Sequence, residues 1–164
     1  MKKTVLVLLT FVPFVVGYAI NLLLAVPVLG AVLYFVLPFV ALGFWFYLGN
    51  LYSKTNWKAL PSILISSATG ILSLVLYIWQ FLIESDATRN MFFAALSQMY
   101  STSTPMYLFG GLARLFESQP NYAGRASFLA LQVIAVVLMI VIFSGGYFWG
   151  KKRSKAKNAQ SFGG

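Results

Sequence analysis

The residues best suited to chemistry are the three acidic ones, which lie between positions 84 and 117. Glu84 and Asp86 are two residues apart with Arg89 close behind, and paired carboxylates can perform acid–base catalysis or bind a divalent cation. Their spacing at the end of an apolar run fits helix capping and a membrane boundary better, and no further acid lies nearby to complete a metal site. We therefore predict no catalytic residue, no metal site and no cofactor.

The composition excludes most other kinds of site. The 164 residues contain no His and no Cys, so disulfides, thiol chemistry, His-ligated haem and ordinary zinc sites are not expected within them. Charged residues make up 9% of the sequence and hydrophobic residues 60%, whereas a soluble domain carries about 25% charged residues. Twelve basic and three acidic side chains cannot cover a soluble exterior. The composition predicts an integral membrane protein of the all-α class.

Long uncharged runs predict the number of helices. Fifty residues without a charge separate Lys3 from Lys54, and a helix needs about 20 apolar residues to cross a bilayer core. This run therefore suits two helices, with a turn near Pro27 and Gly30. Two further uncharged runs follow, at 59–83 and 126–150. We predict a polytopic four-helix transmembrane bundle, a single domain over 1–150, with spans at about 4–25, 29–51, 60–83 and 126–149.

The first of these spans also resembles a cleavable signal peptide. Lys2 and Lys3 precede an apolar stretch, and the small residues Gly17 and Ala19 follow it. Because the apolar run continues well past Ala19, we expect the segment to remain as the first span.

The basic residues predict the orientation of the bundle. In the four-span arrangement one side receives nine basic residues and no acid, and the other receives three Arg balanced by three acids. Because Lys and Arg concentrate on the cytoplasmic side, both termini are predicted to be cytoplasmic, with a bacterial-type plasma membrane as the expected location. The nine are Lys2, Lys3, Lys54, Lys58, Lys151, Lys152, Arg153, Lys155 and Lys157. The net charge of +9 is thus an orientation signal, and nucleic acid is not an expected partner.

The third predicted span carries polar and small residues on one face. They recur at steps of three and four, which is the spacing of one helical face. The members of this stripe are Ser62, Ser66, Thr69, Gly70, Ser73, Tyr77 and Gln80, and Glu84 continues it. Small residues let helices approach closely and hydroxyls can hydrogen-bond across the contact, so the stripe predicts a helix-packing face. The alternative is the polar wall of a cavity or pathway.

Proline and isolated polar residues also lie inside the predicted spans. Pro13 and Pro38 lie in similar segments of the first two spans and are candidate kinks, for packing or as a hinge around a pocket. Asn21 and Gln132 are isolated polar residues expected to hydrogen-bond a neighbouring helix. Tyrosine is the only ionisable side chain expected in the hydrocarbon core, which argues against coupled ion transport by this chain alone.

The outer loop, 84–125, is too apolar for a simple linker. It is predicted to form two short interfacial helices, one from Ala87 to about Tyr100 and one beginning at Pro105. Met91, Phe92, Ala95, Leu96 and Met99 would form the apolar side of the first. The helices could act as a lid over the bundle, dock a partner, or enter the membrane as a re-entrant element.

The C-terminal segment, 151–164, is predicted to be a basic, disordered cytoplasmic tail. Its cluster can contact anionic lipid headgroups, since each basic residue near an anionic leaflet adds about 1 kcal/mol of attraction. The candidate headgroup contacts are Lys151, Lys152, Arg153, Lys155 and Lys157.

Three classes of function are compatible with these patterns. The first is a non-enzymatic subunit or scaffold that assembles by helix packing, either as a homo-oligomer or with another membrane protein. The second is a small transporter or channel component for an uncharged or amphipathic solute, which would use the stripe and the paired prolines. The third is an intramembrane enzyme, which lacks the usual catalytic groups. The small size, the stripe and the apolar outer loop favour the first class.

Overall fold

A computed structural model describes residues 3–102, 104–116 and 124–161 of the chain. Every regular element within these ranges is helical, as the sequence predicts. In chain order they are α1 (Lys3–Leu24), α2 (Pro27–Ser53), α3 (Ala59–Tyr77), the π-helix η1 (Ile78–Ile83), α4 (Met91–Thr102), the 3₁₀-helix η2 (Pro105–Phe116) and α5 (Arg125–Ser161).

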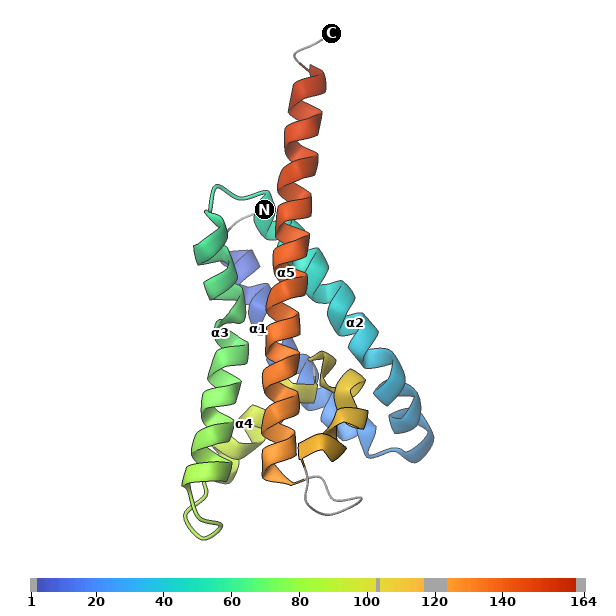
Figure 1. Cartoon of the computed structure of the whole chain (residues 1–164), viewed down its shortest axis with the longest axis vertical. Helices are drawn as coiled ribbons and strands as arrows, with labels where there is room; N and C mark the ends of the chain where they lie inside the picture. The colour runs from blue at the N-terminus through green and yellow to red at the C-terminus, as the bar shows by residue number, and fades with distance from the viewer. Residues whose placement is uncertain (1–2, 103, 117–123, 162–164) are drawn as a thin grey trace.

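Four helices are long and apolar enough to cross a membrane, which indicates an integral membrane protein. They are Lys3–Leu24, Pro27–Ser53, Ala59–Ile83 (α3 continued by η1) and Arg125–Ala156. The four alternate in direction, so α1 begins, α2 ends, α3 begins and α5 ends at the same end of the bundle (Figure 1). We call this end, which carries Lys3, Lys54 and Lys58, the basic end. Arg89, Arg125 and Asp86 lie at the opposite end, so the predicted separation of charge holds for these residues.

The tightest helix contact joins α2 to α5. A methyl group at Gly49 would collide with the carbonyl oxygen of Phe143, and one at Gly146 would collide with that of Phe46. The two backbones can therefore approach this closely only because neither glycine has a side chain. The spacing Gly146–Gly150 is a small-xxx-small pattern, which is the sequence signal for this contact.

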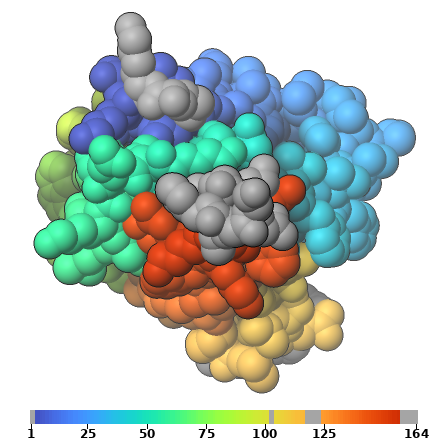
Figure 2. Space-filling model, turned by 90° about the horizontal axis from the view of Figure 1, so that it is seen from above, coloured from blue at the N-terminus to red at the C-terminus, as the bar shows by residue number. Residues whose placement is uncertain are grey.

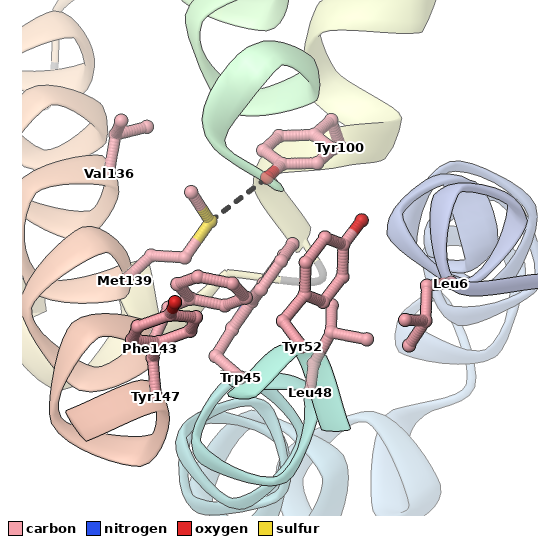
Figure 3. Packing of buried hydrophobic residues seen from close by; sticks show 9 residues of the cluster. All are labelled: Leu6, Trp45, Leu48, Tyr52, Tyr100, Val136, Met139, Phe143 and Tyr147. Carbon is pink, nitrogen blue, oxygen red and sulfur yellow. Dashed lines mark hydrogen bonds between the residues drawn. The ribbon is translucent and has the colours of Figure 1, made fainter. Parts of the chain in front are cut away.

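The main apolar core lies beside this contact and draws on four helices. Trp45, Leu48 and Tyr52 from α2 meet Phe143 and Tyr147 from α5, as Figure 3 shows. The rings of Tyr52 and Phe143 pack edge to face, with centroids 5.3 Å apart. Leu6 from α1, Tyr100 from α4, and Val136 and Met139 from α5 complete the cluster. The core thus joins both helices of the first hairpin to α4 and α5.

The segment between the third and fourth spans differs from its prediction. α4 and η2 form what we call the inserted hairpin, which lies among the long helices instead of across their ends (Figure 1). α4 contacts α1 and α3, and η2 contacts α2 and α5. Tyr100, near the end of α4, packs at the level of Phe14 and Met139, close to the middle of α1 and of the apolar part of α5. The inserted hairpin thus contacts all four long helices.

The physical reason for this difference is the polarity of α4. Its buried residues are Ala94, Ser97, Tyr100 and Ser101, whereas Met91 and Phe92 are 73% and 66% exposed. Of the predicted apolar side, Met91 and Phe92 therefore face outward, whereas the small residues of the other side face the bundle. Ala95, Leu96 and Met99 are half-buried. A helix at a membrane interface would need the reverse arrangement, with its polar side in water.

The last helix also departs from its prediction. α5 begins at Arg125, as expected, but continues to Ser161 through the basic cluster that was predicted to be disordered. In Figure 1 it extends beyond the end of α2. The residues from Lys151 to Ala156 belong to this regular helix, so the helix sets the directions of their side chains relative to the bundle.

Seen from the basic end, the molecule is not a symmetric bundle. The hairpin of α1 and α2 projects to one side and η2 projects to another (Figure 2). Large apolar side chains cover these exteriors, including Val15, Val28 and Phe35, which are 75%, 80% and 71% exposed. An apolar exterior around a partly polar interior is the distribution that a lipid environment favours.

Candidate functional site

The stripe on α3 and η1 faces the interior of the bundle, as its spacing predicts. Each of its seven residues is buried, and they lie where α3 and η1 meet α4, α5 and α1. They are Ser62, Ser66, Thr69, Gly70, Ser73, Tyr77 and Gln80. The opposite face of α3 presents Leu64, Ile71 and Val75, which are exposed. The stripe is therefore the side of this helix from which a polar site could be built.

Ser73 is the centre of the polar contacts. Its Oγ donates a hydrogen bond to the backbone carbonyl of Ser97 in α4 at 2.9 Å and accepts one from Nε2 of Gln132 in α5 at 2.9 Å. All three side chains are fully buried. One hydroxyl thus joins α3, α4 and α5, and Gln132 bonds a neighbouring helix as predicted.

Tyr100 makes a second set of contacts one turn away. Its hydroxyl accepts a hydrogen bond from Oγ1 of Thr69 at 3.3 Å and donates one to the sulfur of Met139 at 3.0 Å, drawn as a dashed line in Figure 3. Its ring packs against Phe14 with centroids 5.2 Å apart. Gly70 leaves room for the phenol, because a methyl group there would come within 3.1 Å of the hydroxyl oxygen. Tyr100 therefore fills the space beside the middle of the stripe.

Gln80 fixes the point where the chain enters the inserted hairpin. Its side-chain oxygen accepts a hydrogen bond from the backbone N–H of Asn90 at 2.7 Å, and its backbone carbonyl accepts one from Nε of Arg89 at 2.8 Å. Asn90 in turn accepts hydrogen bonds from the N–H groups at the start of α4. Gln80 belongs to the π-helical turn η1, a geometry that is rare and frequently found at functional sites.

Charged groups close the opposite end of the bundle. Asp86 accepts hydrogen bonds from Arg89 and from Nη2 of Arg125, so one carboxylate links the loop after η1 to the start of α5. The hydrogen bond from Arg89, together with the positive charges of Arg125 and Arg89, lowers the pKa of Asp86 below its usual value of 3.8. Tyr77 adds a hydrogen bond to the carbonyl of Arg125 at 3.1 Å. We call this group the Asp86 clasp. The carboxylate is an ion-pair partner here, in an arrangement suited to holding two elements together.

The rest of the stripe makes only local hydrogen bonds. Ser62 donates to the carbonyl of Lys58 and Ser66 to that of Ile63, both within one turn of the same helix. These two residues provide small, buried surfaces for packing, so the interhelical hydrogen bonds of the stripe are made by Thr69 and the residues that follow it.

The two candidate kink residues lie beside an apolar groove. Pro13 and Pro38 are both buried inside continuous helices, α1 and α2. A cavity of about 130 Å³ opens between the helices at this level, lined by Pro13, Val16, Leu37 and Val40 among others. Pro13 lies in its wall, and Leu37 and Val40 flank Pro38 in the sequence. Asn21, at the far end of α1, is exposed and has no hydrogen-bond partner among the described residues.

The candidate headgroup residues differ in their environments. Lys151 donates a hydrogen bond to the carbonyl of Thr55 at 3.1 Å and is half-buried, whereas Lys152, Arg153 and Lys155 are exposed. The side chain of Lys157 lies outside the described residues. Lys151 thus ties the loop after α2 to α5, and the other described members remain available to a ligand.

The described interior offers hydroxyl and amide groups for hydrogen bonding. The described residues contain no cluster of three or more His, Cys, Asp or Glu side chains that could hold a metal ion. Four buried polar atoms have no hydrogen-bond partner in the described part of the chain: Trp45 Nε1, Tyr52 Oη, Ser67 Oγ and Gln132 Oε1. The last of these lies next to the contact of Ser73 with Ser97.

Sequence reasoning missed the residues on the partner side of the stripe. Ser97 and Tyr100 are three residues apart, a spacing that also occurs within the stripe itself. This spacing is visible in the sequence, whereas the large apolar residues of the same segment favour an interfacial helix.

Comparisons of the chain with protein-family models, with curated proteins and with solved structures give no match.

Proposed function

We propose that the chain is a non-enzymatic membrane subunit or scaffold that assembles through its α1–α2 hairpin with a helix of another membrane protein or of a second copy. The supporting observation is that the polar interior is filled by the chain itself, whereas the groove between α1 and α2 is not. Ser97 and Tyr100 occupy the polar stripe from within the same chain, whereas the groove beside Pro13 and Pro38 is apolar and open. The same proposal places the bundle in a bacterial-type plasma membrane with both termini cytoplasmic.

Photocrosslinking in native membranes tests this proposal. Val16 and Val40 line the groove, while Val137 and Val141 are similarly exposed on α5 and lie away from it. A photoreactive benzoylphenylalanine at each position samples its lateral neighbours. We expect protein adducts of discrete mass from positions 16 and 40 only, and a doubled mass would identify a second copy. Lipid adducts alone at all four positions would contradict the proposal.

A second candidate function is a component of a pathway for an uncharged or amphipathic solute. It is favoured by the unpartnered Oε1 of Gln132 beside the inserted hairpin and by the irregular helices η1 and η2. Movement of the hairpin away from α3 would expose these polar groups. A disulfide between Ser73→Cys and Ser97→Cys would lock it in place, and the chain has no native Cys to interfere. Solute uptake into proteoliposomes that stops on oxidation and returns on reduction would support the pathway. Unchanged uptake in the locked protein would exclude it.

A further inference from the structure

The basic end contains a cleft between α2 and α5. Gly150 brings the helices together there, because a methyl group in its place would collide with Oγ of Ser53 and lie 2.8 Å from Oδ1 of Asn50. Beyond this contact α2 ends and α5 continues, as Figure 1 shows. The space between them has a volume of about 420 Å³ and is lined by Asn50, Lys54, Gly150, Arg153 and Ser154.

The lining side chains have the chemistry of an anion site. Lys54 and Arg153 each carry a positive charge, and Asn50 and Ser154 can donate hydrogen bonds from neutral groups. None of the four side chains has a hydrogen-bond or ion-pair partner among the described residues. The acids of the described chain, Glu84 and Asp86, lie at the opposite end, so neither compensates the positive charge in the cleft.

The surrounding structure holds the cleft in place. Lys151 donates to the carbonyl of Thr55 and so fixes the loop after α2 against α5. Its ammonium also lies 5.7 Å from the ring centroid of Tyr147, whose hydroxyl donates to the carbonyl of Trp57. Lys54 faces a second cavity of about 240 Å³ as well, whose lining includes Lys3. The two cavities thus share Lys54, and Lys3 is a third cation in this region.

We propose that this cleft binds a phosphate group, carried either by the headgroup of an anionic lipid or by free phosphate. Arg can bind phosphate oxygens through two parallel hydrogen bonds and Lys through a compact charge, so Arg153 and Lys54 form a complementary pair. The pair lies just beyond the apolar part of α5, where headgroups would surround a membrane-spanning helix. Basic pockets between transmembrane helices are known to bind headgroups. The inference rests on membrane insertion of the bundle and is independent of any protein partner.

The test compares two double variants that lose the same charge. Lys54→Gln with Arg153→Gln removes both cations of the cleft, and Lys152→Gln with Lys155→Gln removes two exposed cations of α5 that do not line it. The full chain is purified in neutral detergent, and native mass spectrometry measures retained phosphatidylglycerol against phosphatidylcholine. We expect the wild type and the α5 pair to prefer phosphatidylglycerol, and the cleft pair to bind it at least about tenfold more weakly, because two charge-assisted hydrogen bonds are lost.

Inorganic phosphate distinguishes the two sources of the ligand. Displacement of phosphatidylglycerol by millimolar phosphate, or direct phosphate binding that only the cleft pair loses, assigns the cleft to free phosphate. Retention of the lipid in excess phosphate assigns it to a headgroup. Equal losses in the two double variants would overturn the proposal, because attraction would then follow net charge alone. Equal binding of both lipids by the wild type, without phosphate binding, would overturn it too. Size-exclusion profiles and helical circular dichroism identical to wild type establish that both variants remain folded.

Discussion

At the scale of single residues, helix packing in this molecule depends on which way the small and polar side chains face. Glycine at positions 49 and 146 lets α2 and α5 approach to backbone contact, and Ser73 joins three helices through one hydroxyl. The inward face of the stripe could be predicted because seven residues share one helical periodicity. The partners of that face could not be predicted from the stripe, since periodicity shows which side of a helix is buried and does not identify what covers it.

Replacement of Gly146 by Ala should destabilise the bundle. The added methyl group would collide with the carbonyl oxygen of Phe46 and force α2 away from α5, and overpacking of this kind typically costs about 1–3 kcal/mol. Gly145→Ala is the matched control, because a methyl group there meets no atom within 4 Å. Reversible unfolding in mixed detergent micelles measures both variants. Equal stability of the two would show that α2 and α5 are not in backbone contact.

Loss of the Ser73 hydroxyl should weaken the junction of α3, α4 and α5. Ser73→Ala leaves the carbonyl of Ser97 and the amide of Gln132 without their partner, and interhelical hydrogen bonds in membrane proteins contribute about 0.6–1.7 kcal/mol. Ser62→Ala removes an equally buried hydroxyl that bonds only within its own helix. The same unfolding assay should therefore show a larger loss for Ser73→Ala. A larger loss for Ser62→Ala would contradict the assignment.

At the scale of elements, apolar length predicts the long helices and polarity decides the position of the short ones. Uncharged runs of 20 or more residues can form little else in a bilayer, so the four long helices follow from composition. α4 is short and has one apolar and one polar side, a pattern shared by interfacial and inserted helices. Its position depends on the hydroxyls of Thr69 and Ser73, which complement its polar side. That complementarity is a tertiary property, and a local pattern does not contain it.

The Asp86 clasp should loosen in acid. The pKa of Asp86 is depressed in the folded protein, so its stabilising effect is complete above the usual carboxyl value of 3.8 and is lost as the pH falls through the lower, folded value. Hydrogen exchange of the backbone amides of residues 84–90, corrected for intrinsic rates, should therefore accelerate below about pH 4.

Two variants assign this transition to one carboxylate. Asp86→Asn should exchange rapidly at neutral pH and show no acid transition, because its amide carries no charge to pair with Arg89 or Arg125. Glu84→Gln should retain the transition, since Glu84 bonds Trp79 and Thr88 instead. Protection that is independent of pH in the wild type would contradict the role given to the clasp.

At the scale of the whole molecule, charge and polarity follow two separate axes. Positive charge collects at the basic end, and the Asp86 clasp closes the other end. Across the bundle, polar groups gather in the interior and apolar side chains cover the outside. The end-to-end separation was predictable because charges interrupt the apolar runs. The filling of the interior was not, because it requires α4 and η2 to enter the bundle from its closed end.

The insertion of this hairpin is the central claim, and paired cysteine labelling tests it most directly. Ser97 is fully buried against α3, whereas the adjacent Gln98 is exposed and lines an open cavity with Arg89 and Arg125. The native chain has no Cys, so each substitution supplies one thiol. In proteoliposomes, a membrane-impermeant maleimide should label Gln98→Cys and leave Ser97→Cys unmodified until the protein is denatured. Equal, rapid labelling of both positions would mean that α4 lies in water outside the bundle, and would contradict the account.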